Sequence, residues 1–161
     1  MDHRHAHEDH EARHGRPYLA FAVNMALSLA AMYLVMFAMI DGWSDFYNNL
    51  NTFYMALAMV APMGILMLAT MSGMYRRKRL NLALHAGFVL LFVVAFAATR
   101  MQGLIDDRQF IRSMIPHHSG AILMCREARL ADPELVDLCG AIIEAQRSEI
   151  ERMEAIAARL R

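Results

Sequence analysis

Hydrophobic residues are concentrated in three long runs within the first hundred residues. Residues 18–40 and 53–75 are uncharged and largely apolar, and residues 80–99 form a third run, interrupted only by Asn81 and His85. Each run has about 20 residues or more, enough to cross a hydrocarbon core of roughly 30 Å at about 1.5 Å per residue. Because a helix satisfies its own backbone hydrogen bonds in lipid, we predict three transmembrane helices over residues 18–99.

Beyond residue 100 the apolar positions take the three- and four-residue spacing of amphipathic helices. Asp106 and Asp107 suit the start of one helix, and Asp132 with Pro133 suits the start of a second. We therefore predict a helical hairpin over residues 100–161, joined flexibly to the third span at Gly103. The apolar stripe of the second helix comprises Leu135, Leu138, Ile142, Ile143, Ile150, Met153 and Ile156 or Ala157.

A single hairpin of about 60 residues is too small to bury both of its apolar faces. Two copies would form a four-helix bundle around a shared core, so we expect a homodimer or a higher even oligomer. The predicted fold class is all-α: three transmembrane helices followed by a hairpin that forms a ferritin-like four-helix bundle on dimerisation.

Charge sets the expected orientation in the membrane. Residues 76–79 are Arg-Arg-Lys-Arg, whereas the loop over residues 41–52 has two aspartates and no Lys or Arg. The positive-inside bias places the basic loop and the N-terminus in the cytoplasm, and the hairpin outside a bacterial cytoplasmic membrane. A cleaved signal peptide is the alternative for the N-terminus, but the first span is too long for one.

Residues 1–17 are polar and rich in histidine, and we expect them to form a disordered cytoplasmic arm. Such a tract binds Zn, Ni or Cu ions loosely, or it is simply a solvated tail. Its histidines, which are secondary metal candidates, are His3, His5, His7, His10 and His14. The formal net charge of zero and the lack of a basic stripe argue against a nucleic-acid partner.

Composition agrees with a membrane protein, since 57% of the chain is hydrophobic. The 15 methionines include a four-residue series in the second span, which winds slowly around the helix. Thioethers in a row could conduct copper, but flexible apolar packing is the stronger interpretation. The series consists of Met55, Met59, Met63, Met67 and Met71.

Other positions in the spans suggest helix contacts. Ala69 and Gly73 offer a small-residue pair for close approach between helices, and Pro62 suggests a kink. Asn81 and His85 are intramembrane polar residues, for which bonding to a neighbouring helix is the favoured role.

The candidate chemistry is in the hairpin. His117 and His118 follow Pro116, and each lies beside Met114 on the helix surface. Thioether sulfur and imidazole nitrogen suit a soft ion such as Cu(I) better than Mg or Ca. The predicted metal ligands are Met114, His117, His118 and Met124, with Glu149 and Met153 from the facing helix of the same or the other subunit. The alternative is a hydrogen-bonded pair of histidines without metal.

Counting outward from Asp132 brings residues of the two arms level. Cys125 and Cys139 both lie seven residues away, so a disulfide is expected in an oxidising compartment, with a thiolate metal site as the alternative. The same count brings Met114 level with Ile150, and His118 level with Gln146.

These residues also resemble a known family. The pattern Asp107-x-x-Phe110-x-x-x-Met114-Ile115-Pro116-His117-His118-x-x-Ala121-Ile122-x-Met124, followed by Pro133, Ile143, Gln146, Glu149-Ile150 and Met153, is similar to the bacterial domain-of-unknown-function family 305. The resemblance covers about residues 106–160. It implies a ferritin-like helical bundle and, because some members are exported proteins linked to copper resistance, a copper site at Met114, His117, His118 and Met124. The two cysteines depart from the family pattern.

The sequence thus predicts a membrane-anchored protein that binds copper, as Cu(I), for sequestration or delivery outside the membrane. The alternatives are a structural module that dimerises without metal and a copper-conducting protein. A ferritin-like metal oxidoreductase is disfavoured, because the hairpin has no Glu-x-x-His pair and several glutamates would be required. We therefore do not expect an enzyme.

Overall fold

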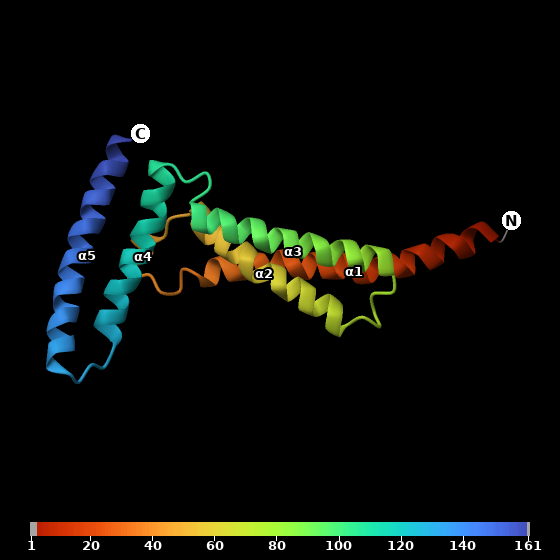
Figure 1. The fold of residues 1–161 in the computed structure, drawn as a ribbon, viewed down its shortest axis with the longest axis horizontal. Helices are drawn as coiled ribbons and strands as arrows, with labels where there is room; N and C mark the ends of the chain where they lie inside the picture. Colours follow the sequence, from red (N-terminus) through yellow and green to blue (C-terminus); the bar gives the residue numbers. More distant parts are fainter. Residues whose placement is uncertain (1–2, 161) are drawn as a thin grey trace. The chain divides into compact units, whose positions relative to one another are not determined.

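The structure is a computed structural model that describes the backbone of residues 3–160 and the side chains of residues 16–160. The described chain is all-α, as predicted, with no strand. Its helices are α1 (His3–Val35), α2 (Leu50–Thr70), α3 (Lys78–Met101), α4 (Asp107–Glu127) and α5 (Pro133–Arg159), with a short 3-10 helix η1 (Trp43–Asp45) between α1 and α2 (Figure 1).

Three of these helices are long and apolar enough to cross a membrane, as the sequence predicts: Arg16–Val35 in α1, Leu50–Thr70 and Lys78–Met101. The predicted ends at residues 40 and 75 are too late, since the helices end at Val35 and Thr70. The residues after Val35 are apolar although they lie outside the helix. One of them, Phe37, is buried in the loop, with its ring centroid 4.4 Å from that of Phe46. Hydrophobicity alone does not separate a buried loop from the helix before it.

The second span also begins earlier than the predicted residue 53. Asn49 Oδ1 accepts a hydrogen bond from the Thr52 N–H at 2.8 Å, so Asn49 caps a helix that begins at Leu50. At the N-terminus, α1 begins at His3, where the sequence suggests a disordered arm up to residue 17. Ala, Glu and Arg in this stretch are good helix formers. The arm histidines' side chains lie outside the described residues.

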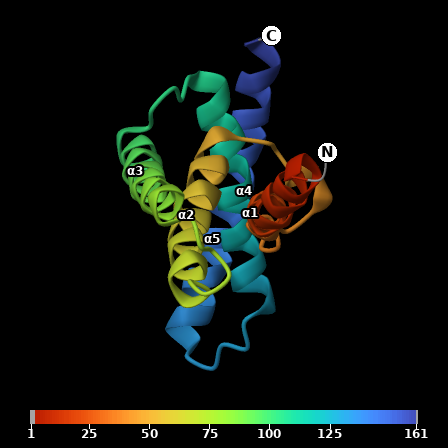
Figure 2. The same ribbon diagram turned by 90° about the vertical axis from the view of Figure 1, so that its right-hand side faces the viewer.

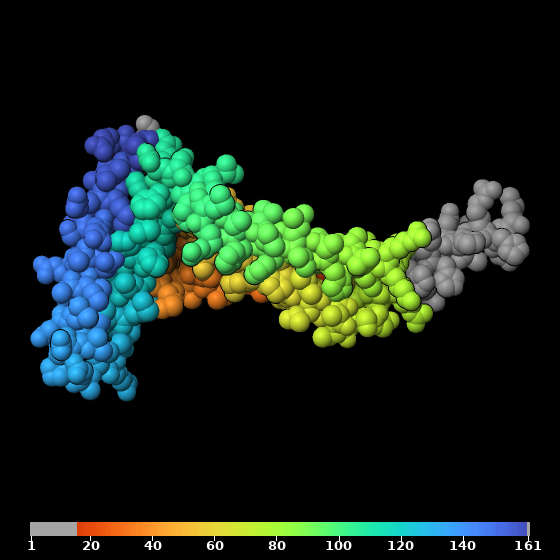
Figure 3. Space-filling view, viewed as in Figure 1, coloured from red at the N-terminus to blue at the C-terminus, as the bar shows by residue number. Residues whose placement is uncertain are grey.

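The chain divides into two compact units, and the first contains residues 1–32 and 55–97. The core of this first unit consists of Phe21, Met25, Val60, Leu68 and Tyr75. Of the three long apolar helices, α2 has the largest share of buried residues. That share is 33% of its apolar stretch, against 11% for α1 and 6% for α3. Many apolar side chains of α1 and α3 are exposed, among them Leu27, Leu82 and Leu90, which suits contact with lipid. Figure 3 shows α3 along one face of this unit.

The methionine series of α2 divides between the core and the surface of this unit. Met63 and Met67 pack against the core together with Met32, whereas Met59 is 48% exposed. This is the arrangement expected of a series that winds around a helix. The contacts of Met63 and Met67 are those of apolar packing residues.

Close helix approach occurs at a different small residue from the predicted pair. A side chain at Gly64 would come within 2.7 Å of the Phe88 ring, so α3 packs directly onto the α2 backbone there. Gly73 has open space around it, and Ala69 is exposed. The prediction of Ala69 and Gly73 was wrong because α2 ends at Thr70, so Gly73 lies in the following turn.

The polar residues of the third span bond as expected for Asn81 but not for His85. Asn81 Oδ1 accepts from the Tyr18 hydroxyl at 2.8 Å, which joins α3 to α1. His85 Nδ1 instead lies 2.7 Å from the carbonyl of Asn81 in its own helix. Asn81 therefore connects two spans, and His85 is satisfied locally.

The second unit contains residues 33–54 and 98–161. Its α4 and α5 run antiparallel as the predicted hairpin, which Figures 1 and 2 show from two sides. The connection into α4 turns through Gln102 and Leu104, which have φ of 52° and 59°, whereas Gly103 has no positive φ. The two residues in the left-handed region therefore flank Gly103, which the sequence analysis expected to be the flexible connection.

Candidate metal site

Aspartate caps begin both helices of the hairpin. Asp106 Oδ1 accepts from the Gln109 N–H at 2.8 Å, and Asp132 Oδ1 accepts from the Leu135 N–H at 3.0 Å. Pro133 occupies the first turn of α5, where a missing N–H has no cost. Pro116 lies within α4 and does not end it. The sequence therefore placed both helix starts correctly.

A disulfide joins the two helices near the tip of the hairpin. Cys125 and Cys139 are bonded, with Cα atoms 5.2 Å apart and a sequence separation of 14. In this structure their sulfurs are therefore not available as thiolate ligands.

The centre of the candidate site is a contact between α4 and α5. His118 Nδ1 lies 3.0 Å from Glu149 Oε2, with the histidine side chain 14% exposed and the glutamate side chain 50% exposed. The angles fall outside those of a hydrogen bond, so the buried Nδ1 has no hydrogen-bond partner despite this short distance. His118 is thus a partly buried imidazole beside a solvated carboxylate.

One methionine on each helix lies a turn away from this contact. Met114 precedes His118 by four residues on α4, and Met153 follows Glu149 by four residues on α5, so each is a neighbour on its helix surface. Met153 packs against the hydrophobic core of the hairpin, which consists of Ile111, Ile115, Ile122 and Ile150. The structure thus brings His118 and Glu149 into contact and places Met114 and Met153 beside them; we call these four residues the donor quartet.

The other two predicted ligands do not join the donor quartet within one chain. His117 is exposed, and its ring centroid lies 6.2 Å from that of His118. Met124 is 53% exposed and lies two turns further along α4. Within one chain these two side chains face solvent.

The pairing of α4 with α5 at the site differs from the prediction made by counting outward from Asp132, which placed His118 opposite Gln146. The disulfide keeps the counted pairing because cysteine side chains are short. His118 instead meets Glu149, three residues further along α5. Helical side chains lean toward the N-terminus of their own helix, so the ends of two long side chains in an antiparallel pair meet at a larger offset.

A buried polar contact beside the site has no counterpart in the sequence predictions. Ser119 is fully buried; its hydroxyl accepts from the Asp41 N–H at 2.6 Å and donates to Asp45 Oδ2 at 2.5 Å. Next to it, a side chain at Gly120 would come within 3.2 Å of the Met39 carbonyl oxygen. The small pair Ser119–Gly120 after the histidines is the only sequence signal of this close packing.

An ion pair extends this contact along α4. Arg126 Nη1 lies 2.5 Å from Asp41 Oδ1, although the angles are not those of a hydrogen bond. Hydrogen bonding to Glu127, with a smaller contribution from the charge of Asp41, raises the pKa of Arg126, which therefore stays charged. The loop before α2 is thus joined to α4 on the side of α4 away from His117.

Among the described side chains, no three His, Cys, Asp or Glu residues cluster as a metal site. The donor quartet contains one histidine and one glutamate, and its other donors are thioethers.

Comparison with known proteins finds two similarities. Residues 95–157 match the family model described as "Domain of unknown function (DUF305)". The chain is also 35% identical, over 114 residues, to an uncharacterised protein of Acanthamoeba polyphaga mimivirus, an alignment that covers 70% of this chain and 73% of the relative. No solved structure matches.

Proposed function

The chain belongs to the DUF305 family, and we propose that it is a membrane-anchored protein that binds Cu(I) for sequestration or delivery. The observation that carries this proposal is the donor quartet: a partly buried imidazole, His118, with Met114 one turn away on its own helix and Met153 one turn from Glu149 on the facing helix. Soft thioether donors combined with imidazole favour Cu(I) over hard ions.

Glu149 has a supporting role in this site. A carboxylate beside one imidazole nitrogen orients the ring and leaves the other nitrogen for a metal. His118 Nδ1 lies beside Glu149 Oε2, so Nε2 is the nitrogen we assign to copper.

A second copy of the chain would add the remaining donors. Exposed or half-exposed residues follow one another at three- and four-residue steps along one side of each helix; we call them the open seam. It comprises Phe110, Met114, His117, Ala121 and Met124 on α4, and Leu135, Leu138, Ile142, Glu149 and Ile156 on α5, where the last two steps are of seven residues, or two turns. Such spacing is that of a helix-bundle interface, so we propose a homodimer, or a higher even oligomer, with a ferritin-like four-helix bundle.

In such a bundle His117 and Met124 would face the partner instead of solvent. Each is exposed in the single chain, yet both lie on the open seam beside the donor quartet. Dimerisation would therefore complete the predicted six-residue set, with His117 and Met124 as donors across the interface.

We also propose that the hairpin lies on the outer side of a bacterial cytoplasmic membrane. Residues 76–79 carry four positive charges between α2 and α3, and such loops stay in the cytoplasm. Three spans then carry the chain from a cytoplasmic N-terminus to an external hairpin. An oxidising external compartment also suits the disulfide.

Anaerobic Cu(I) titration against a chromophoric competitor tests the proposal. All proteins carry alanine at the five arm histidines, so that the arm does not contribute. We expect the parent to bind Cu(I) stoichiometrically, and His118→Ala or Met114→Leu to weaken binding by at least about tenfold, or roughly 1.4 kcal/mol. His85→Ala is the matched control, because His85 bonds within α3.

Absence of Cu(I) binding by the parent would contradict the proposal and leave a dimeric anchor. Equal loss of binding in His85→Ala and His118→Ala would show a general effect on the fold. Leucine is close in volume to methionine, so Met114→Leu removes the sulfur with little change in packing.

A further inference from the structure

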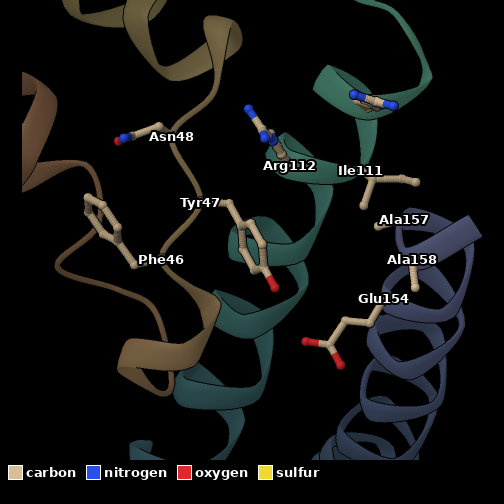
Figure 4. Close-up of a pocket in the computed structure, with 9 residues that line it drawn as sticks. Phe46, Tyr47, Asn48, Ile111, Arg112, Glu154, Ala157 and Ala158 are labelled. Carbon is tan, nitrogen blue, oxygen red and sulfur yellow. The ribbon is translucent and has the colours of Figure 1, made fainter. Parts of the chain in front are cut away.

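The hairpin unit contains a cavity that lies apart from the donor quartet. It has a volume of about 520 Å³, within the size range of small-molecule sites. Three walls enclose it: the loop of residues 46–48, the first turns of α4 and the last turns of α5 (Figure 4). Its lining consists of Phe46, Tyr47, Asn48, Arg108, Ile111, Arg112, Glu154, Ala157 and Ala158.

Two guanidinium groups stand on the α4 wall. Arg108 and Arg112 are four residues apart and so lie on the same side of the helix. Within residues 16–160 neither forms an ion pair with a carboxylate. Arg108 donates one N–H to the Leu160 carbonyl, and the guanidinium of Arg112 extends from α4 away from Glu154 (Figure 4). Several donors that match a phosphate therefore remain free.

The α5 wall carries the opposite charge. Glu154 points toward the hydroxyl of Tyr47 across the cavity (Figure 4). Burial, followed by the charges of Glu154 and Asp45, raises the pKa of Tyr47, so its hydroxyl stays protonated beside the carboxylate. Glu154 forms no ion pair with either cavity arginine among the described residues. The cavity thus keeps positive and negative groups apart instead of pairing them.

The cavity lies at the end of the hairpin that adjoins the spans. Asn48 is two residues before the start of α2, and Arg108 is seven residues after the end of α3. Gln109 Oε1 accepts from the Leu50 N–H at 3.0 Å, and the Tyr54 hydroxyl donates to the Gly103 carbonyl at 2.9 Å. These bonds hold the first turn of α2 against the start of α4.

We propose that this cavity binds a phosphate ester that also carries an ammonium group, as in a phosphatidylethanolamine headgroup. The phosphate would contact Arg108 and Arg112, and the ammonium group would contact Glu154. Separated charges of both signs match such a zwitterion, and along the chain Asn48 and Arg108 lie only a few residues from helices apolar enough to cross a membrane. This site is independent of the copper proposal, since it shares no residue with the donor quartet.

Native mass spectrometry of the full-length protein, with defined amounts of phosphatidylethanolamine or phosphatidylglycerol, tests this inference. We expect the wild type to retain phosphatidylethanolamine preferentially. Arg112→Gln should reduce retention of both lipids about tenfold, as for loss of a charge-assisted hydrogen bond. Glu154→Gln should abolish only the preference for the ethanolamine lipid. The matched controls are Arg147→Gln and Glu151→Gln, because both residues lie on α5 but outside the lining of this cavity.

Soluble glycerophosphoethanolamine, added as a competitor, identifies the source of the ligand. Displacement only at large excess supports the lipid, whereas displacement at equal concentration supports the free ester. Unchanged retention in Arg112→Gln, or an equal loss in Arg147→Gln, would overturn the site.

Discussion

Ser119 decides how closely the loop before α2 approaches the hairpin. Its hydroxyl is fully buried and fully used, accepting from the Asp41 N–H and donating to Asp45. Gly120 provides the space for the Met39 carbonyl beside it. Because a buried polar group without a partner is costly, this pair of bonds determines the position of the loop.

Ser119→Ala should lower the free energy of unfolding by about 1–3 kcal/mol, because the Asp41 N–H and the Asp45 carboxylate lose a buried partner. Thermal unfolding of the purified protein in detergent measures the effect. Ser148→Ala, at an exposed position on α5, is the control and should change stability by less than about 0.5 kcal/mol. Equal effects at the two serines would show that the buried contact does not matter.

At the scale of the elements, the hairpin is positioned by two caps, one disulfide and an isoleucine core. The caps set where α4 and α5 begin, and the disulfide sets their pairing at the tip. The core of Ile111, Ile115, Ile122 and Ile150 then holds His118 against Glu149 further along. The donor quartet therefore depends on the register of the whole hairpin.

Replacing Cys125 and Cys139 by alanine should destabilise the hairpin by about 3 kcal/mol, as expected for opening a loop of about 15 residues. Chemical denaturation followed by circular dichroism, with and without a thiol reductant, measures this. Reductant should lower wild-type stability and leave the double variant unchanged. If oxidised wild type and double variant unfold together, the cross-link does not stabilise the hairpin.

At the scale of the whole molecule, the open seam is the surface that most needs a partner. Leu138 is 53% exposed and Phe110 50% exposed, and a hairpin of this size leaves such residues in water unless a second copy covers them. The same surface carries His117 and Met124, so assembly and metal binding are linked in our proposal.

Leu138→Asp should convert the protein from a dimer to a monomer, since it places a charge in the middle of the open seam. Multi-angle light scattering in detergent should give twice the chain mass of 18.3 kDa for the wild type and a single chain mass for the variant. Val136→Asp is the matched control, because Val136 is similarly exposed, at 48%, but lies off the seam. A monomeric wild type, or dimer loss in both variants, would contradict the assignment of the interface.

Local signals in the sequence were sufficient to locate three apolar helices and the starts of both hairpin helices. Long uncharged runs identified the three spans, and Asp106 and Asp132 identified the starts of the hairpin helices, because span length and capping depend on neighbouring residues. The spacing of Met114 and His118 likewise placed them side by side on one helix.

Contacts between distant segments were decided only by the tertiary structure. The pairing of His118 with Glu149, the burial of Ser119 against Asp41 and Asp45, and the approach of Phe88 to Gly64 depend on how side chains lean and how closely backbones pack. Packing also decided where α1 and α2 end. After α1, for example, Phe37 is buried in a loop although it is as apolar as the helix before it. Periodicity describes one helix at a time, whereas packing is a property of at least two.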